Sequence, residues 1–246
     1  MMLRMFDDFV DPADHLALDE VTLMRASQNE SDGSQVPADV LRVWEFAGPV
    51  VVAGRSTRID YEIDKEYCRD HKIPVLRRCS GGASVVAGPG CLMYSVVLSH
   101  QGRESMKKID VAHTYVMDRV LKATQQQVEQ AELQGVCDLT WKNRKCSGNS
   151  LRVTRSHVLY HGTLLYDFDL ELLANCLCEA PRQPTYRSGR DHREFVTNIP
   201  IDPLQFVDDL EQAFEVEGKM EANSLRDEIR RMREQRYDSQ AWHFRH

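Results

Sequence analysis

The chain has 246 residues, of which 42% are hydrophobic and 28% are charged, a composition typical of folded globular proteins and unlike that of disordered or fibrous chains. Its net charge of −7 and isoelectric point near 5.7 argue against a broad basic surface for nucleic acid. The N-terminus turns acidic at Asp7 and Asp8, and no run approaches the roughly 18 apolar residues of a membrane span. We therefore expect a cytoplasmic protein that neither binds nucleic acid nor enters a membrane.

The cysteines are odd in number, scattered along the chain, and contain no Cys-x-x-Cys pair. They are Cys68, Cys79, Cys91, Cys137, Cys146, Cys176 and Cys178. This spacing favours neither a disulfide framework nor a zinc site, so we expect no metal site in the protein itself.

Hydrophobic spacing and turn residues predict alternating short strands and helices. In chain order, we expect a helix at 14–25, a polar loop at 27–37, a strand hairpin formed by 41–45 and 49–54, a helix at 64–72, a strand at 73–78, and a second hairpin formed by 83–86 and 92–98 around the turn 87–90. A long amphipathic helix at 110–134, strands at 137–141, 144–147 and 157–168, a helix at 170–178 and a charged helical tail from 203 follow.

Short turns join most of the neighbouring strands, which favours antiparallel pairing. We therefore predict an α+β fold whose central sheet is mostly antiparallel or mixed and is flanked by helices.

A glycine-rich segment, Arg77-Arg78-Cys79-Ser80-Gly81-Gly82-Ala83, lies between two predicted strands. Glycines let backbone N–H groups approach an anion closely, and arginine can donate two hydrogen bonds to a phosphate or a carboxylate. A tight turn flanked by exposed arginines would have the same residues. The segment alone therefore leaves an anion site and a structural turn open.

A second segment places a lysine at the edge of a strand that enters a turn, in Asn143-Arg144-Lys145-Cys146-Ser147-Gly148-Asn149-Ser150. A lysine held there could stabilise negative charge as it develops on a phosphoryl or carbonyl oxygen. A solvated lysine beside a turn is the alternative.

Two further segments carry polar residues. His161 stands in the apolar strand Tyr160-His161-Gly162-Thr163, where a histidine is more often a hydrogen-bonded core residue than a base, and Gly162 could admit a ligand close to the backbone. Residues 182–192 are basic and rich in turn residues, which suits either a flap over a phosphate or a loop held by ion pairs.

In this order, the segments resemble the lipoate-protein ligase A branch of the biotin/lipoate A/B protein ligase superfamily. The family stretch Arg-Arg-x-Ser-Gly-Gly-Gly-Ala-Val is similar to residues 77–85, its Lys-x-Ser-Gly-Asn/Ser-Ala element to 145–150, and its His-Gly-Thr-Leu-Leu strand to 161–165. The resemblance covers most of residues 14–200, and the ordered combination is far more specific than any one motif.

The resemblance implies an α+β catalytic domain like that of biotin protein ligases and related to the class II synthetase fold, at residues 1–202. It also implies that residues 203–246 form a charged helical tail, too short for the full accessory domain of many bacterial ligases. A separate accessory chain is therefore one expected partner.

The implied reaction has two steps, and its expected cofactors are ATP and Mg²⁺. Lipoate or octanoate attacks the α-phosphate of Mg-ATP to give an acyl-AMP, and a lysine amine of a lipoyl carrier domain then attacks the acyl carbonyl. The expected carriers are of the 2-oxoacid dehydrogenase E2 or glycine cleavage H protein type. Both steps develop negative charge near one cation and need no enzyme nucleophile.

By the resemblance, Lys145 is catalytic and contacts both the acyl carboxyl group and the α-phosphate. The substrate strand carries His161, Gly162 and Thr163. The residues expected to bind ATP or the acyl-adenylate are Arg78, Ser80, Gly81, Gly82, Ala83, Ser84, Val85, Val86, Asp138 and Lys145.

The chain departs from the family pattern at several positions. Ala83 replaces the third glycine, Val86-Ala87 replaces an aromatic-histidine pair, and Cys91 and Met93 stand where the family has asparagines. Relatives without the accessory domain include octanoyl- and lipoyl-transferases that use a cysteine thioester.

An acyl carrier-to-carrier transferase is therefore one alternative. Its nucleophile would be Cys137 or Cys146, because a thiolate beside Lys145 has a depressed pKa. Strand alternation would turn the Cys146 side chain away from that of Lys145, which makes Cys137 the better candidate, although a buried structural cysteine is more common than a nucleophile. A non-catalytic lipoyl-binding homologue is the other alternative.

Overall fold

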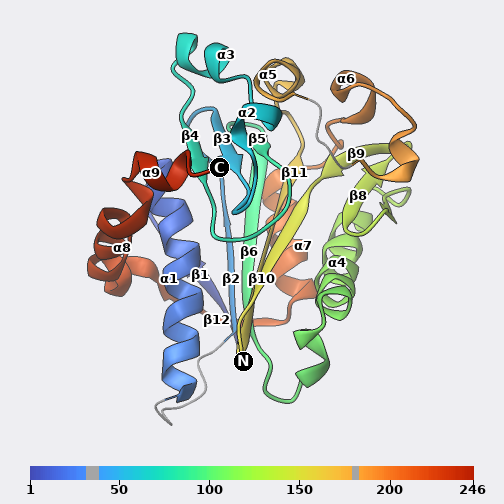
Figure 1. Ribbon diagram of the computed structural model, residues 1–246. Coiled ribbons are helices and arrows are strands. Elements are labelled where there is room, and N and C mark those ends of the chain that lie inside the picture. Colours follow the sequence, from blue (N-terminus) through green and yellow to red (C-terminus); the bar gives the residue numbers. More distant parts are fainter. Residues whose placement is uncertain (32–38, 179–182) are drawn as a thin grey trace.

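The computed structural model describes residues 1–31, 39–178 and 183–246. Its centre is a six-stranded sheet in the order β10-β11-β6-β2-β1-β12 (Figure 1). The bounds are β1 Met2–Phe6, β2 Asp39–Trp44, β6 Cys91–Ser99, β10 Asn149–Val153, β11 His157–Leu165 and β12 Val216–Glu221. Strand β1 pairs in parallel with β2 and with β12, and the other neighbours are antiparallel. The expected α+β fold with a mixed, mainly antiparallel sheet is confirmed.

Helices cover both faces of this sheet (Figure 1). Helix α1 (Pro12–Ser31) packs on one face, with α8 (Arg226–Met232) against it, and α4 (Ile109–Gln125) and α7 (Pro203–Ala213) cover the other. Strand β6 shows why: Leu92, Tyr94 and Val96 join the core under α4, whereas Met93 and Val97 join the core under α1. Because successive side chains of a strand point to opposite faces, a strand buried on both faces is apolar throughout.

Two small sheets complete the fold beside the central one. One has the order β4-β3-β5, with β3 Val50–Ala53, β4 Val75–Arg77 and β5 Val85–Ala87, and the other the order β7-β8-β9, with β7 Glu132–Gln134, β8 Asp138–Trp141 and β9 Arg144–Ser147. The remaining helices are α2 Ile59–Glu62, α3 Lys65–Asp70, α5 Leu170–Cys176, α6 His192–Phe195 and α9 Gln240–His243. Single turns of 3₁₀ helix lie at Glu104–Lys107, Thr185–Arg187 and Ala222–Leu225, and a π-helical turn at Arg233–Tyr237.

Both predicted hairpins are wrong. Strands β2 and β3 lie in different sheets, as do β5 and β6, and β3 pairs with β4 in parallel and with β5 antiparallel. The turns at 48–49 and 87–90 carry the chain from one sheet to the other. The physical reason is that both edges of β2 are filled by β1 and β6, and both edges of β6 by β2 and β11, so neither β3 nor β5 can pair there.

The extent of several elements also differs from the predictions. The helix expected at 110–134 ends at Gln125, and β7 follows it. Strands β1 and β10 were not predicted. The segment from 203 contains the predicted helices, but it also supplies β12, which pairs with β1 at the edge of the central sheet.

The helix expected at 14–25 continues to Ser31, so the loop expected at 27–37 is wrong for residues 27–31. Residues 32–37, and Arg182 at the start of the basic segment, lie outside the described residues. Within the described part of the chain, no helix is long and apolar enough to cross a membrane.

Candidate active site

The glycine-rich segment folds around the side chain of Arg78. This guanidinium is buried and donates hydrogen bonds to the carbonyl oxygens of Val52 (2.9 Å), Ala83 (2.9 Å) and Gly81, and to Oγ of Ser80 (3.1 Å). Burial lowers the pKa of Arg78 to about 10, which leaves it charged at neutral pH. Arg78 lines the cavity described below, but in this structure its donors hold the loop together.

Gly82 is required by this arrangement. Its φ is +84°, and a Cβ there would lie 2.9 Å from Nη2 of Arg78. Only glycine adopts such a conformation without strain while leaving room for the guanidinium.

Ser80 and His161 belong to a buried chain of hydrogen bonds. Nε2 of His161, on β11, lies 2.5 Å from Oγ of Ser80, and its Nδ1 lies 3.1 Å from a carboxylate oxygen of Asp19, on α1. This network indicates that the serine hydroxyl donates to Nε2 and that Nδ1–H donates to Asp19. His161 is thus a buried, hydrogen-bonded residue, which links α1 to the glycine-rich loop.

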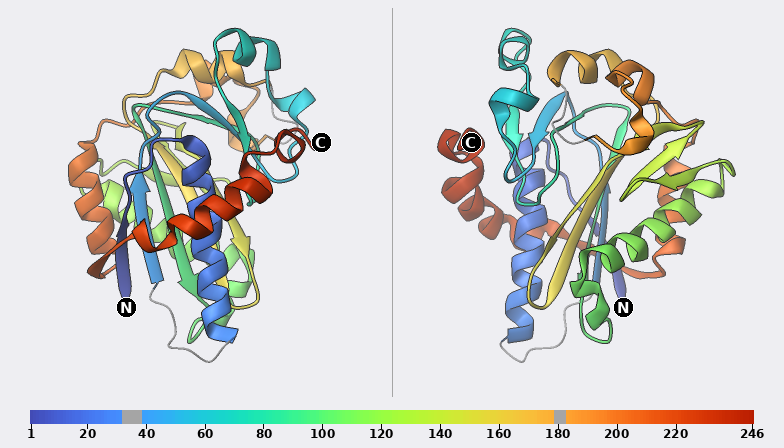
Figure 2. Two further views of the ribbon diagram at one scale, coloured as in Figure 1. Left: turned by 90° about the vertical axis from the view of Figure 1, so that its left-hand side faces the viewer. Right: turned by 45° about the vertical axis from the view of Figure 1, so that its right-hand side comes forward.

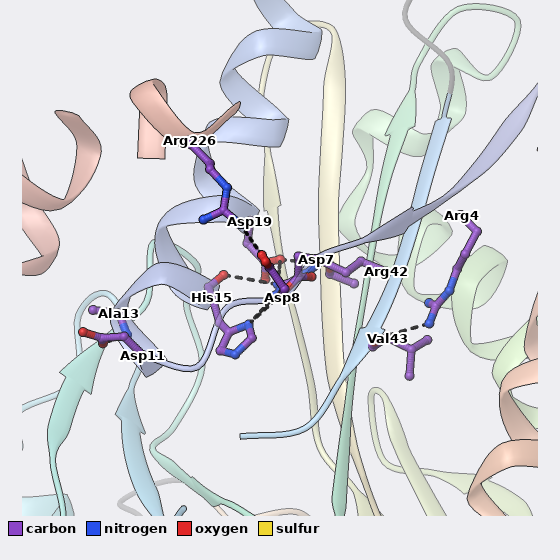
Figure 3. A network of polar contacts seen from close by, with 11 residues as sticks. Arg4, Asp7, Asp8, Asp11, Ala13, His15, Asp19, Arg42, Val43 and Arg226 are labelled. Atoms are coloured by element: carbon purple, nitrogen blue, oxygen red, sulfur yellow. Dashed lines mark hydrogen bonds and ion pairs between the residues drawn. The ribbon is translucent and has the colours of Figure 1, made fainter. Parts of the chain in front are cut away.

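Asp19 is itself held by a buried network around Arg42 (Figure 3). The Arg42 guanidinium forms ion pairs with Asp7 (2.7 Å) and Asp19 (3.3 Å), and it lies 3.8 Å from the ring centre of Trp44. It also donates to Nδ1 of His15. Burial, together with the neighbouring Arg42 charge, lowers the pKa of His15 to about 4, so His15 is neutral and can accept this bond.

Lys145 is placed by the hairpin of β8 and β9. Lys142 and Asn143 both have positive φ, 51° and 58°, as expected of a tight two-residue hairpin turn. Nζ of Lys145 lies 2.7 Å from a carboxylate oxygen of Asp138, whose other oxygen accepts a hydrogen bond from the Tyr186 hydroxyl (2.8 Å). The lysine side chain is 29% exposed, so it remains open to solvent and to a ligand.

Gly148 leaves room for this lysine. A Cβ at Gly148 would lie 3.3 Å from Cε and 3.4 Å from Nζ of Lys145, tighter than ordinary contact. The Ser-Gly-Asn turn that follows the lysine therefore has a packing role beside it.

Lys145 stands where two cavities adjoin. The residues shared by both cavities are Ala83, Ser84, Val85, Lys145, Gly148 and Thr163. The first cavity has an apolar wall and a polar end, and its further lining includes Leu16, Trp44, Val52, Met93, Arg78, Gly82, Gly162, Asp19 and His161. The second is lined by Val86, Leu165, Leu173, Leu177 and Phe195, together with the polar residues Arg187 and His192. This arrangement can hold an apolar chain and an anion on either side of one cation.

Most of the expected site residues therefore come together here. Asp138 reaches the site through its ion pair with Lys145. Ser80 and Gly81 lie beside the cavities instead of lining them: Ser80 is buried, and the Gly81 carbonyl accepts hydrogen bonds from Arg78 and from Ser150 (2.8 Å).

The two candidate thiols are placed differently. Cys146 is fully buried and directs its Sγ at the carbonyl of Leu139 (3.3 Å), away from Lys145 as strand alternation predicts. Cys137 contacts the carbonyl of Asn149 (3.5 Å). Burial raises the pKa of Cys137 to about 11 and that of Cys146 to about 12, and neither lines the two cavities. Both are therefore protonated thiols at neutral pH, which disfavours a thioester mechanism.

Some residues that line or support the site were not identified from the sequence. The apolar wall of the first cavity comes from four separate elements, so no local sequence motif predicts it. Arg42 had one usable signal, because a charged residue inside an apolar strand must find a buried partner. Tyr186, Arg187 and His192 were noted only as parts of a basic segment. Among the described residues, no group of three or more His, Cys, Asp or Glu side chains could hold a metal ion.

Comparison with known proteins places the chain in one family. Residues 11–215 match the family model of the lipoyl protein ligase A/B catalytic domain, and the chain therefore belongs to this family. It is 24% identical over 250 residues to lipoate-protein ligase 1 of Staphylococcus aureus, covering 97% of this chain and 71% of that protein. It is 28% identical over 163 residues to the lipoate-protein ligase LplJ of Bacillus subtilis, covering 65% of this chain but only 46% of that protein.

Solved structures show the same fold. A lipoate-protein ligase A bound with ATP superimposes with a TM-score of 0.80 at 19% identity, covering 99% of both chains. A candidate lipoate protein ligase of Thermoplasma acidophilum with bound lipoic acid gives 0.80 at 19% identity, covering 100% of both chains. The bipartite lipoate protein ligase of the same organism, studied with its E2 lipoyl domain, gives 0.77 at 18% identity, covering 99% of this chain and 95% of that one.

Proposed function

We propose that this protein is a lipoate-protein ligase, which uses ATP to convert lipoate to lipoyl-AMP and then transfers the lipoyl group to a lysine of a carrier domain. The observation that carries the proposal is the position of Lys145 at the junction of two adjoining cavities. Family membership supports it, as do the names of the relatives that match most of the chain.

The first cavity is the proposed acyl site. Leu16, Trp44, Val52 and Met93 offer the apolar surface that the hydrocarbon chain of lipoate or octanoate requires. The carboxylate of the chain would then point toward Lys145. The related T. acidophilum structure with bound lipoic acid supports lipoate as a ligand of this fold.

The second cavity is the proposed nucleotide site. Arg187 and His192 on its wall can face phosphate groups, and Ala83, Ser84 and Val85 lie on the border shared with the first cavity. Mg²⁺ would arrive with ATP, and the Asp138 carboxylate beside Lys145 is a hard oxygen donor suited to it. A related ligase structure with bound ATP supports a nucleotide at this fold.

The chemistry follows from the placement of one cation between two substrates. A carboxylate oxygen of the acid attacks the α-phosphorus of ATP, and pyrophosphate leaves. The carrier amine then attacks the acyl carbonyl, loses a proton, and AMP leaves. In both steps negative charge develops on oxygens that Lys145 can contact, so the lysine would stabilise both transition states without forming a covalent bond.

The acyl acceptor is a lysine of a lipoyl carrier domain, in this proposal of the E2 or glycine cleavage H protein type. The T. acidophilum ligase and its E2 lipoyl domain support such a partner. The same ligase is bipartite, which supports the further proposal that a separate chain assists activation here.

One assay tests the proposal. The protein is incubated with lipoate, Mg-ATP and an apo carrier domain, and we expect AMP release together with a lipoyl mass increment on the carrier. The transferase alternative predicts no AMP, and instead transfer from octanoylated carrier that is lost in Cys137→Ala or Cys146→Ala. That second pattern would refute the ligase assignment, and the absence of both reactions with every carrier would favour a non-catalytic lipoyl-binding homologue.

A further inference from the structure

Arg77, the first residue of the arginine pair, lies outside both cavities and has no part in the function proposed above. Its side chain is fully buried, and its guanidinium donates to the carbonyl oxygens of Gly54 (2.6 Å), Thr57 (2.9 Å) and His243 (2.9 Å). One side chain thus joins the turn after β3 to helix α9, although these segments are almost two hundred residues apart in sequence.

The backbone of Arg77 is held from the same helix. Strand β4 is an edge strand of its small sheet, so one side of it has no strand partner. On Arg77, the N–H donates to Nδ1 of His243 (3.0 Å), and the C=O accepts from Nε1–H of Trp242 (2.9 Å). Two adjacent side chains of α9 therefore replace the missing strand; Figures 1 and 2 show α9 beside β4.

His243 is fixed in one orientation by a second bond. Its Nε2–H donates to the carbonyl of Tyr237 (2.8 Å), and the ring is buried. The Tyr237 hydroxyl in turn donates to Glu20 on α1 (2.8 Å), beside Asp19. The segment from Tyr237 to His243 is thus anchored to the helix that supports His161.

The rest of the glycine-rich segment, residues 78–83, forms a loop that packs on the segments held by Arg77. The backbone N–H of Arg78 donates to the carbonyl oxygen of Ala53 (3.0 Å), and the backbone N–H of Arg55 donates to the carbonyl oxygen of Ser80 (2.7 Å). A Cβ at Gly54 would lie 1.9 Å from the Gly82 carbonyl oxygen, so the two backbones are in direct contact. Any shift of β4 relative to this turn must move the loop.

We propose that Trp242 and His243 are positioning residues for the glycine-rich loop, acting through the backbone and side chain of Arg77. Neither residue lines the acyl or the nucleotide cavity. The kinetic part of the test rests on the proposed ligase activity, whereas the structural part does not.

The experiment compares His243→Ala with His243→Gln and with the control His113→Ala. His113 is also a buried histidine with one side-chain hydrogen bond, to Tyr160 (3.0 Å), but it lies on α4, on the other face of the sheet. Glutamine at 243 can supply one acceptor and one donor, so it should restore part of the effect. Amide hydrogen exchange is measured for peptides covering 77–86 and 91–99, and kcat/KM for lipoate and for ATP.

We expect His243→Ala to raise exchange at 77–86 by at least tenfold with unchanged exchange at 91–99, and to lower kcat/KM by about 10- to 100-fold, as misplacement of a binding group does. His113→Ala should leave amide exchange at 77–86, and kcat/KM for lipoate and for ATP, at wild-type values. Unchanged loop exchange in His243→Ala, or an equal effect in His113→Ala, would overturn the inference.

Two further arms keep the result decisive. If His243→Ala does not fold, Trp242→Phe removes the N–H that donates to the Arg77 carbonyl while keeping an aromatic ring, and it should raise exchange at 77–86 in the same direction. If the wild-type protein shows no ligase activity, the proposed function fails, but the exchange comparison still tests the positioning role.

Discussion

Lys145 and Asp138 form an ion pair that is open to solvent at the lysine. The Lys145 side chain is 29% exposed and that of Asp138 11%, so the lysine is the open end of this ion pair. A phosphate or carboxylate can reach the ammonium group from that open side. By contrast, the Arg42 pairs with Asp7 and Asp19 are buried, and removal of one partner would leave an uncompensated charge.

His15 makes the buried Arg42 network sensitive to pH. Burial lowers its pKa to about 4 from an ordinary 6.5, so the unfolded chain binds more protons between these values. The free energy of unfolding should therefore fall as the pH drops through this window. Asparagine at position 15 keeps an acceptor for Arg42 but does not titrate.

We predict that the wild type loses about 2 kcal/mol more stability than His15→Asn between pH 7 and pH 5, since one pKa unit corresponds to about 1.4 kcal/mol. Urea unfolding of both proteins at the two pH values measures the difference. Equal losses would show that His15 is not held neutral.

At the scale of elements, β11 forms the floor shared by the two cavities and allows no side chain at Gly162. A Cβ there would lie 1.9 Å from Oδ1 of Asn149 and 2.6 Å from the Tyr94 hydroxyl. Tyr94 donates to Asn149 at this point, which ties β6 to β10 across the glycine. Close approach of neighbouring groups, and not backbone conformation, therefore requires glycine here.

Gly162→Ala should lower the free energy of unfolding by about 1–3 kcal/mol, because overpacking a buried site forces its neighbours to move. Gly48→Ala is the matched control, since a Cβ at Gly48 meets nothing within 4 Å. Chemical denaturation of the two variants gives the comparison. A Gly162→Ala protein as stable as Gly48→Ala would contradict the packing seen around β11.

The sequence predicted the type of most elements correctly but not their partners. Hydrophobic spacing identified α1, α4, β6 and β11, because the helical and the strand patterns of apolar residues are both local properties of the sequence. The turn at Gly48-Pro49 has the same composition whether it closes a hairpin or carries the chain to another sheet, and only the filled edges of β2 decide. Strand β12 was missed because its exposed side alternates Glu217, Lys219 and Glu221, which resembles a charged helix.

The site was predictable where its residues are contiguous in sequence. Three short motifs supply residues that line the cavities: 82–86, Lys145 and 161–163. The apolar wall was not predictable, since Leu16, Trp44 and Met93 meet only after α1, β2 and β6 pack together. The same holds for Tyr186, whose hydrogen bond to Asp138 joins distant segments.

At the scale of the whole molecule, the segment after residue 202 is built into the fold that carries the site. Helix α7 packs beside α4, β12 extends the central sheet, and α8 lies against α1 (Figure 2). Arg236 and Tyr237 both bind Glu20 of α1. Contacts from this segment therefore reach α1, which lines the first cavity, and β4, which leads into the glycine-rich segment.

In the proposed reaction, Lys145 stabilises the negative charge that develops in acyl-adenylate formation. The most direct measurement is kcat/KM for lipoate-dependent AMP formation in Lys145→Ala, with Lys142→Ala as control, since Lys142 is a neighbouring exposed lysine that lies over the Trp141 ring. We predict a fall of about 10²- to 10³-fold in Lys145→Ala with an unchanged melting temperature, and wild-type activity in Lys142→Ala. Normal turnover in folded Lys145→Ala would show that Lys145 does not stabilise this charge.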